Sequence, residues 1–209
     1  MIYRIENINN PNYTEALYEK AYNEMSYERK QKADRYKNIA DKKLCVFSDM
    51  LLREMLKDTF GIEAPEFYIN EKGKPCLMGN NLHFSISHSG SFVACAVDTS
   101  PVGIDIEIPR PINKRMLDHC FTNEEVRFIV SDLSSLPDSI PADSPETHRF
   151  LSMWTAKEAY LKFTGEGLGG GLKNIVTIED GKLKSSINNK QLITIHNNDY
   201  VLSIITQIT

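Results

Sequence analysis

The stretch Gly103-Ile104-Asp105-Ile106-Glu107 alternates isoleucine with acidic residues, a pattern typical of a β-strand. Because side chains two residues apart on a strand share a face, Asp105 and Glu107 should point the same way while the isoleucines pack behind them. Two neighbouring carboxylates repel each other unless a proton or a cation lies between them. The same alternation is also typical of a strand that faces solvent, so its meaning depends on what lies opposite.

A helix is predicted about fifty residues later, over Trp154-Thr155-Ala156-Lys157-Glu158-Ala159-Tyr160-Leu161-Lys162. Its four-residue spacing places Glu158 and Lys162 on one face, one turn apart. A surface ion pair would explain this spacing alone. Strand and helix together, however, offer three carboxylates and one cation. Oxygen ligands favour a hard divalent ion that also keeps waters and substrate phosphates, so the sequence predicts a magnesium–phosphate site.

Length and composition limit the class of protein. At 209 residues, the chain is long enough for one larger domain or two small ones. No apolar run approaches the roughly 18 residues of a membrane span, and Met1-Ile2-Tyr3-Arg4 does not resemble a signal peptide, so we expect a cytoplasmic protein that does not bind membranes. The net charge of -4 argues against nucleic-acid binding.

The four cysteines do not form a recognisable metal or disulfide pattern. They are scattered along the chain, and none belongs to a C-x-x-C pair: Cys45, Cys76, Cys95 and Cys120. Neither a zinc site nor a disulfide framework is therefore expected.

Periodicity divides the chain into two helix-and-strand sets. The first set has a strand over 2–8, helices over 13–25, 28–36 and 41–57, and short strands between 66 and 98. The second set has helices over 112–119 and 123–130, the latter with a capping box from Thr122 to Glu125, and a loop over 131–145. A helix from about residue 145 to Gly165 follows, and then strands over 175–178, 191–195 and 200–205.

The two sets end alike. Residues 91–97 and residues 199–205 both follow a polar turn and form an apolar strand. This likeness predicts two related α+β halves, residues 1–100 and 101–209, with a ligand site at the seam between them.

A second group of residues predicts an anion pocket. The strand Phe84-Ser85-Ile86-Ser87-His88-Ser89-Gly90 runs into a polar turn with Ser87 and His88 near its end, and Lys74 lies in the preceding Gly73-Lys74-Pro75 turn. Arg29 and Lys32 belong to a basic stretch over 29–37, which is typical of a solvated helix face and could also meet a terminal phosphate.

Four of these motifs together resemble the surfactin-synthetase-activating type of the 4′-phosphopantetheinyl transferase superfamily. The motifs match in order and approximate spacing: Gly73-Lys74-Pro75, residues 84–90, residues 102–107 and residues 154–162. The resemblance implies a pseudo-dimer of two similar halves, each a small antiparallel sheet packed with helices. It also implies a monomer that binds coenzyme A and Mg²⁺ between the halves.

The resemblance also implies a role for individual residues. Asp105, Glu107 and Glu158 would be the magnesium ligands, and Lys162 would pair with the coenzyme A pyrophosphate. The nucleotide and its 3′-phosphate would be held by the remaining matched residues, which are Lys74, Ser87, His88, Arg29 and Lys32.

The implied reaction transfers the 4′-phosphopantetheine arm of coenzyme A to a serine of an apo acyl or peptidyl carrier protein. Adenosine 3′,5′-bisphosphate is released. Glu158, acting directly or through a water bound to the metal, is the first candidate for the base, and Glu107 is the second. Two alternatives remain open at this point. One is a magnesium-dependent hydrolase of nucleotide pyrophosphates, and the other is a non-catalytic coenzyme A-binding protein.

Overall fold

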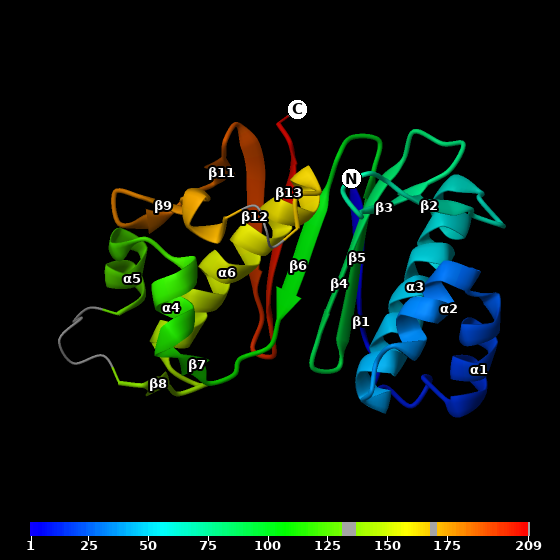
Figure 1. Cartoon of the computed structure of the whole chain (residues 1–209), viewed down its shortest axis with the longest axis horizontal. Coiled ribbons are helices and arrows are strands. Elements are labelled where there is room, and N and C mark those ends of the chain that lie inside the picture. Colours follow the sequence, from blue (N-terminus) through cyan, green and yellow to red (C-terminus); the bar gives the residue numbers. More distant parts are fainter. Residues whose placement is uncertain (131–136, 168–170, 209) are drawn as a thin grey trace. The chain divides into compact units, whose positions relative to one another are not determined.

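The computed structural model describes residues 1–130, 137–167 and 171–208, and Figure 1 shows the course of the chain. The chain divides into an N-terminal unit, Met1–Val102, and a C-terminal unit, Gly103–Thr209. Each unit consists of an antiparallel sheet with helices packed against it. The predicted α+β class with two halves is therefore confirmed.

The N-terminal unit contains a three-stranded sheet in the order β1-β5-β4 and a separate β2-β3 hairpin. In its core, Leu52 and Met55 of helix α3 belong to one cluster with Phe84, Val93 and Val97 of the sheet. The elements are β1 (Ile2–Asn7), α1 (Glu15–Glu24), α2 (Tyr27–Asp34), α3 (Ile39–Phe60), β2 (Phe67–Ile69), β3 (Pro75–Leu77), β4 (His83–Ser89) and β5 (Phe92–Asp98).

The C-terminal unit contains a four-stranded sheet in the order β11-β12-β13-β6, on which helix α6 packs through β6 and β13. Two short strand pairs, β7-β8 and β9-β10, accompany it. The elements are β6 (Gly103–Glu107), β7 (Ile112–Asn113), α4 (Lys114–Cys120), α5 (Asn123–Ile129), β8 (Ser139–Ile140), α6 (Pro145–Thr164), η2 (Leu172–Asn174), β9 (Ile178–Glu179), β10 (Lys182–Leu183), β11 (Ser186–Ile187), β12 (Lys190–His196) and β13 (Val201–Gln207).

The long helix of the C-terminal unit has well-defined ends. Ser144 caps α6 by accepting a hydrogen bond from the backbone N–H of Thr147, and Pro145 occupies the first turn, where its missing N–H is not needed. Gly165 ends the helix in the left-handed region with φ of 73°. The helix predicted from about residue 145 to Gly165 is therefore confirmed. In the N-terminal unit, Gly61 ends α3 in the same way with φ of 68°.

The two sheets repeat one strand order. In each unit the first strand pairs with the last strand, and the last strand pairs with the strand before it. The register agrees with the predicted likeness of residues 91–97 and 199–205, because Arg4 of β1 lies opposite Cys95 and Asp105 of β6 lies opposite Ser203. Residues of β1 and β6 can therefore be compared position by position.

Several predicted boundaries differ from the structure. The helix expected from residue 112 begins at Lys114, because Ile112–Asn113 pair as β7 with β8, and β8 itself lies in the predicted loop 131–145. The strand expected over 175–178 was wrong for most of its length, since the residues before it form a turn of 3₁₀ helix and pairing begins at Ile178. Residues 131–136 and 168–170, which include part of that loop and of the glycine run, lie outside the described residues.

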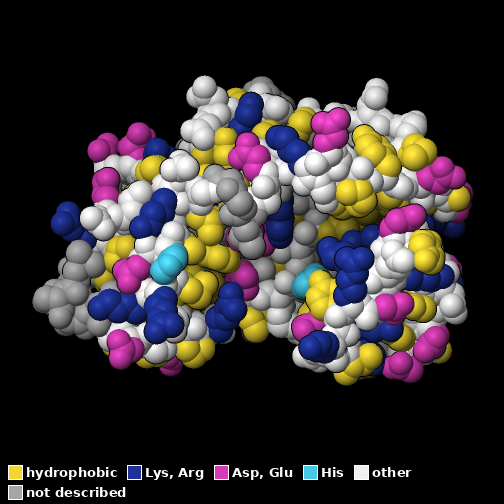
Figure 2. All heavy atoms as spheres, viewed as in Figure 1, with side chains coloured by type: hydrophobic (Ala, Val, Ile, Leu, Met, Phe, Trp, Pro, Cys, Tyr) yellow, Lys and Arg dark blue, Asp and Glu magenta, His cyan; other side chains and the backbone are white. Residues whose placement is uncertain are grey.

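The surface carries both signs of charge. On the face shown in Figure 2, Lys and Arg side chains are interspersed with Asp and Glu side chains. In the part of the chain that the structure describes, no helix is both long and apolar enough to cross a membrane. All four cysteines are free thiols.

Candidate active site

Strand β6 presents Asp105 and Glu107 on one face and buries Ile104 and Ile106 on the other. Asp105 is itself buried, with only 4% of its surface exposed. This alternation along β6 agrees with the prediction that the two carboxylates share a face. The strand is held in the sheet by β13, where Ser203 is the direct neighbour of Asp105.

Lys162 of α6 reaches the first of these carboxylates. Its Nζ donates a hydrogen bond to Oδ1 of Asp105 at 2.6 Å, and the Lys162 side chain is 29% exposed against 6% for Asp105. Such a short contact between a cation and a buried carboxylate is a charge-assisted hydrogen bond. The helix and the strand that the sequence singled out are thus joined directly.

Trp154 connects the same helix to the second carboxylate. Its indole Nε1–H donates to Oε1 of Glu107 at 3.3 Å, and its ring stacks on Phe150 with centroids 5.8 Å apart. Arg110 adds a longer ion pair to Glu107 at 3.6 Å. Because the indole bonds to the strand while its ring packs on the helix core, Trp154 braces α6 against β6.

Glu158 lies between these two contacts along the helix. Burial raises its pKa from the ordinary value of 4.5 to about 7, with further raising by the charges of Asp105 and Glu107 and an opposing effect from Lys162. The charge effects of Asp105 and Glu107 require the acidic groups of strand and helix to lie close together. The carboxyl group of Glu158 therefore holds its proton more tightly than an exposed carboxyl group does.

This donor set suits a hard divalent cation. All three acidic side chains offer oxygen, and the pKa of Glu158 is raised first by burial and then by the charges of Asp105 and Glu107, whose repulsion a cation would relieve. Among the described residues, however, no group of three or more His, Cys, Asp or Glu side chains already stands in position to hold a metal ion. In this arrangement, Asp105 bonds to Lys162, and Glu107 accepts from Trp154.

A largely buried hydroxyl cluster between α6 and the sheet includes Ser203, the strand neighbour of Asp105. Thr155 Oγ1 lies 2.8 Å from Ser203 Oγ, and Thr194 Oγ1 lies 3.2 Å from the same atom. Sequence reasoning missed this cluster, because Ser203 sits in an apolar strand. Its position opposite Asp105 became visible only with the strand register.

A buried ion pair beside the site was also missed. Lys157 Nζ donates to Oε2 of Glu125 at 2.7 Å and to the carbonyl oxygens of Cys120 at 3.1 Å and Leu172 at 3.0 Å. Both charged side chains are fully buried. Oε1 of Glu125 accepts from the backbone and the hydroxyl of Thr177. The predicted capping box placed Glu125 correctly at the start of α5 but gave no sign that it also pairs with Lys157.

Burial works against ionisation of this pair. It is the largest influence on the pKa of Lys157, which is lowered. Burial would also raise the pKa of Glu125, but hydrogen bonds from Lys157, Thr122 and Thr177 lower it overall. Both groups are satisfied by partners on several elements, so the pair fixes α6 relative to α5 and to the segment that follows η2.

The residues predicted to bind the nucleotide lie in the N-terminal unit. Ser87 is buried in β4 and pairs with Ala94, while His88 pairs with Val93. Neighbouring strand residues project to opposite faces, so the two side chains do not share one. His88 takes the face of Phe84, which packs into the core under α3.

Lys74 is partly buried just before β3. Its Nζ donates to the carbonyl oxygen of Val102 at 3.4 Å, and burial lowers its pKa. The charge of Lys74 also contributes to a lowered pKa of His83, after burial. Lys74 therefore lies near the start of β4, whereas Ser87 and His88 lie near its end.

The two basic residues of α2, Arg29 and Lys32, lie in different environments. Arg29 donates from Nε to Oδ1 of Asp49 at 2.9 Å, and Arg53 donates to Oδ2 of the same carboxylate at 2.7 Å. Asp49 is buried, whereas Lys32 is exposed. Arg29 is thus held in a fixed position by α3.

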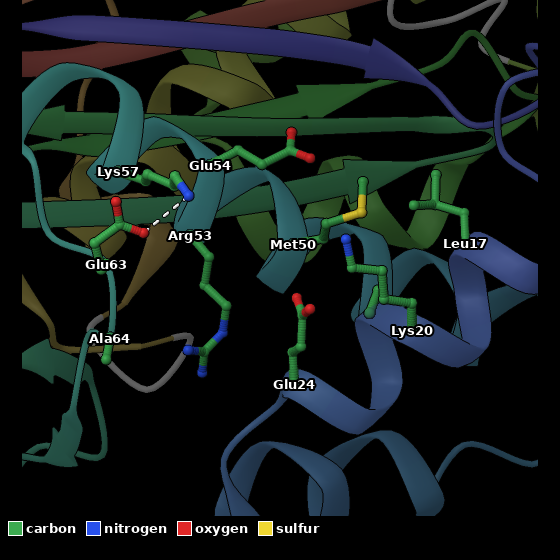
Figure 3. A pocket seen from close by; sticks show the side chains of 10 residues that line it. Leu17, Lys20, Glu24, Met50, Arg53, Glu54, Lys57, Glu63 and Ala64 are labelled. Carbon is green, nitrogen blue, oxygen red and sulfur yellow. Dashed lines mark ion pairs between the residues drawn. The ribbon is translucent and has the colours of Figure 1, made fainter.

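The N-terminal unit also contains a cavity of about 580 Å³, shown in Figure 3. One ion pair, between Lys57 and Glu63 at 2.8 Å, crosses its wall. None of the predicted site residues lines it. Its walls come from α1, α3 and the loop after α3, and they are formed by Leu17, Lys20, Ala21, Glu24, Met50, Arg53, Glu54, Lys57, Glu63 and Ala64.

Comparison with known proteins gives matches over both units. The family model described as the 4′-phosphopantetheinyl transferase superfamily matches residues 101–205, and the model described as 4′-phosphopantetheinyl transferase, N-terminal, matches residues 10–100. A solved structure, holo-[acyl-carrier-protein] synthase from Thermotoga maritima, aligns over 52% of this chain and 64% of that chain, with a TM-score of 0.38 and 16% identity.

Three curated relatives are 4′-phosphopantetheinyl transferases from Bacillus. The relative psf-1 of Bacillus pumilus is 31% identical over 76% of this chain and 66% of its own length. The relative ffp of Bacillus subtilis is 30% identical over 76% of this chain and 69% of its own length. The relative Sfp of Bacillus subtilis strain 168 is 33% identical over 69% of this chain and 62% of its own length.

The chain thus spans about two thirds of the length of the curated relatives that it matches. The resemblance to the surfactin-synthetase-activating type is confirmed by these Bacillus relatives. Since the superfamily model covers half of the sequence, and the acidic strand and helix that carry the resemblance both fall within it, the chain belongs to the 4′-phosphopantetheinyl transferase superfamily.

Proposed function

We propose that the protein transfers the 4′-phosphopantetheine arm of coenzyme A to a serine of an apo acyl or peptidyl carrier protein. The Bacillus relatives that bear the name of this activity support the proposal. The observation that carries it is the contact between β6 and α6, in which Lys162 bonds to Asp105 and Trp154 bonds to Glu107. The charges of these two acids also act on Glu158, which supports a shared site.

The protein's own residues contribute position and charge to the reaction. The ammonium group of Lys162 would stabilise negative charge on the coenzyme A pyrophosphate. This charge grows as the phosphorus–oxygen bond to the leaving bisphosphate breaks. Asp105 fixes the Lys162 side chain at 2.6 Å and so limits where that charge can lie. Holding reactive groups in place in this way accounts for much of catalysis in phosphoryl transfer.

A base must accept the proton of the carrier serine as its oxygen bonds to the β-phosphorus. Glu158 is the first candidate, because a pKa of about 7 makes its carboxylate a competent acceptor near neutral pH. Glu107 is the second candidate, and the indole of Trp154 holds its Oε1. The proton would pass to a carboxylate oxygen directly or through a water.

Mg²⁺ dependence is part of the proposal. Asp105, Glu107 and Glu158 would hold the ion, which when bound would neutralise phosphate oxygens and position them. The oxygen-only character of these three side chains supports this assignment, as does the repulsion from Asp105 and Glu107, which adds to the effect of burial in raising the pKa of Glu158.

The N-terminal unit would bind the nucleotide of coenzyme A. We assign the 3′-phosphate and the rest of the nucleotide to residues that the resemblance marked, namely Lys74, Ser87, His88, Arg29 and Lys32. The salt bridge to Asp49 supports a phosphate contact for Arg29, because it leaves the guanidinium fixed while its remaining N–H groups can still donate. A monomeric state and a cytoplasmic location stay predictions of this proposal.

Mass spectrometry of the carrier tests the function directly. The protein would be mixed with coenzyme A, MgCl₂ and an apo carrier of the fatty-acid, polyketide or nonribosomal-peptide type. A mass gain of one phosphopantetheine arm, with release of adenosine 3′,5′-bisphosphate, is the expected result. Cleavage of coenzyme A without a carrier would instead identify a nucleotide pyrophosphate hydrolase. Binding of coenzyme A without any mass change in all three carriers would identify a non-catalytic binding protein.

A further inference from the structure

Gly103, the first residue of β6, lies where α6 approaches the sheet most closely. A Cβ atom built on Gly103 would overlap the carbonyl oxygen of Ala159 and would lie 2.6 Å from the backbone nitrogen of Phe163. Both obstacles are backbone atoms of the helix, so no change of side-chain rotamer can relieve the overlap. Gly103 does not have the left-handed φ seen at the chain's turn glycines, so the lack of space is the reason that glycine is needed here.

The backbone atoms that Gly103 meets belong to the immediate neighbours of the site residues. Ala159 follows Glu158, and Phe163 follows Lys162. Gly103 shares its strand face with Asp105 and Glu107, because residues two apart on β6 point the same way. The close approach therefore occurs one position away from the groups that form the site. A helix displaced at Gly103 would carry both Glu158 and Lys162 away from the strand.

The N-terminal unit shows what happens when a side chain occupies this position. Gly103 pairs with Ile205, and the matching position of the other sheet is Ile2, which pairs with Val97. Ile2 packs its side chain against the core of its unit. There the long helix α3 packs mainly on β5 and β4, whereas α6 packs on β6 and β13. The long helix thus packs closely on the first strand in the C-terminal unit, where that strand begins with Gly103.

We propose that Gly103 is a positioning residue for the reaction. By leaving space for the backbone of α6, it sets the separation at which Lys162 reaches Asp105 and Glu158 faces both acidic residues of β6. This inference rests on the proposed function, since it assigns Gly103 a part in the same site. It predicts that one methyl group at position 103 impairs transfer without touching substrate.

The test uses Gly103→Ala in the full chain, with two readouts. We expect kcat for carrier modification to fall on the order of 10–100-fold with little change in KM for the carrier, because groups misplaced by about an ångström lose most of their catalytic effect. Trp154 is the chain's only tryptophan, and its indole bonds to Glu107, so its emission reports the contact between α6 and β6 independently of activity. The emission should shift to the red, and quenching by acrylamide should increase.

Two control variants separate positioning from general loss of stability. Ile187→Ala creates a cavity in β11, at the opposite edge of the sheet from β6, and should leave the Trp154 emission and the kcat of the folded fraction unchanged. Ala159→Gly should not rescue Gly103→Ala, because the overlap involves the carbonyl oxygen of Ala159 rather than its side chain. If Gly103→Ala does not fold, Ala159→Val replaces it, since a larger buried side chain on α6 displaces the same contact from the helix side.

Retention of wild-type kcat and wild-type Trp154 emission in Gly103→Ala would overturn the inference, as would equal losses in Ile187→Ala at the same folded fraction. If Gly103→Ala does not fold, the same unchanged values in Ala159→Val would overturn it. Failure of the proposed function looks different. In that case the wild-type protein itself would not modify any carrier, while the fluorescence comparison would still decide whether Gly103 sets the position of α6.

Discussion

The two units place a charged pair at the same point of sheet and helix, but with opposite polarity. In the C-terminal unit, the strand carries the negatively charged Asp105 and the helix carries the positively charged Lys162, at a distance of 2.6 Å. In the N-terminal unit, the strand carries Arg4 and the helix carries Asp58, which are 3.1 Å apart. Arg4 and Asp105 occupy matching positions in the register of the two sheets. The shared fold therefore fixes where a pair forms and leaves its sign open.

A glutamate accompanies each pair at the same helical position. Glu54 and Glu158 both lie seven residues before the glycine that ends their helix. Burial raises the pKa of each. The charge of Asp58 adds to the effect at Glu54, as the charge of Asp105 does at Glu158. At Glu158 the pKa rises to about 7.

The two charged clusters differ in how far their side chains are buried. The side chains of Arg4 and Asp58 are 39% and 53% exposed, so their pair contributes about 0–1 kcal/mol to stability. The side chain of Asp105 is only 6% exposed, and α6 packs closely on its strand at Gly103. A buried carboxylate next to a partly buried ammonium is a strongly directed electrostatic arrangement, and this difference in burial makes the C-terminal cluster the candidate for chemistry.

The largest difference between the clusters should appear in activity when each loses its strand charge. Asp105→Ala should lower carrier modification about 100–1000-fold, because it removes a proposed metal ligand and releases Lys162. Arg4→Ala is the matched control and should keep kcat within about twofold, since its pair lies on an exposed surface. Initial rates from carrier mass spectra, with circular dichroism to confirm folding, provide the measurement. Comparable losses in the two variants would remove the functional distinction between the units.

Exchanging the polarity of the C-terminal pair tests whether sign or pairing matters. Asp105→Lys combined with Lys162→Asp gives this cluster the polarity of the N-terminal one. We expect a folded protein whose transfer rate is lower by about 100-fold or more, because charge of the wrong sign would lie where phosphate must be bound. The control combines Arg4→Asp with Asp58→Lys and should change the free energy of unfolding by about 1 kcal/mol or less. A catalytically normal exchange variant would refute the assignment of Asp105.

A smaller effect is expected from the arginine pair that shares Asp49. Arg29→Ala should weaken coenzyme A binding several-fold and dephospho-coenzyme A binding less, because only the former carries the 3′-phosphate assigned to Arg29. Arg53→Ala provides the control, since it removes the other partner of Asp49. Isothermal titration calorimetry with both ligands measures the difference. Equal losses for the two ligands would argue against a 3′-phosphate contact by Arg29.

The smallest effect concerns stability against pH. A carboxyl group whose pKa is higher in the folded state binds more protons there, so stability falls as pH rises through the window from 4.5 to about 7 for Glu158. Glu158→Gln should remove part of that fall, so in EDTA its advantage in melting temperature over wild type should be larger at pH 8 than at pH 5. Glu54→Gln should act in the same direction but more weakly. Parallel pH profiles for wild type and Glu158→Gln would contradict the burial argument.

Much of the site could be predicted because it depends on local spacing. Alternation along a strand places Asp105 beside Glu107, and one helical turn separates Glu158 from Lys162, whatever the rest of the chain does. That β6 lies under α6 was a hypothesis, drawn from the combined carboxylates and from the resemblance, since packing of distant elements leaves little trace in one sequence. Strand alternation also places Ser87 and His88 on opposite faces, a conclusion that the sequence contained and that the anion-pocket prediction did not use.

The missed contacts join residues that are far apart in the sequence. Lys157 and Glu125 are far apart in sequence and charged, and charged residues are usually solvated, so nothing in the pattern marks them as buried partners. Ser203 was hidden for the opposite reason, because a single hydroxyl in an apolar strand gains meaning only from its register with Asp105. Local composition could not reveal either relationship.

The ammonium group of Lys157 collects oxygens from three separate segments, at Cys120, Glu125 and Leu172. Separation from Glu125 would leave two buried charges uncompensated, and loss of either carbonyl would leave a buried N–H donor unsatisfied, so the opening motions of these segments are coupled. Backbone amides of α5, the middle of α6 and Thr177 should consequently show one common free energy of opening in hydrogen–deuterium exchange, as a single cooperative foldon.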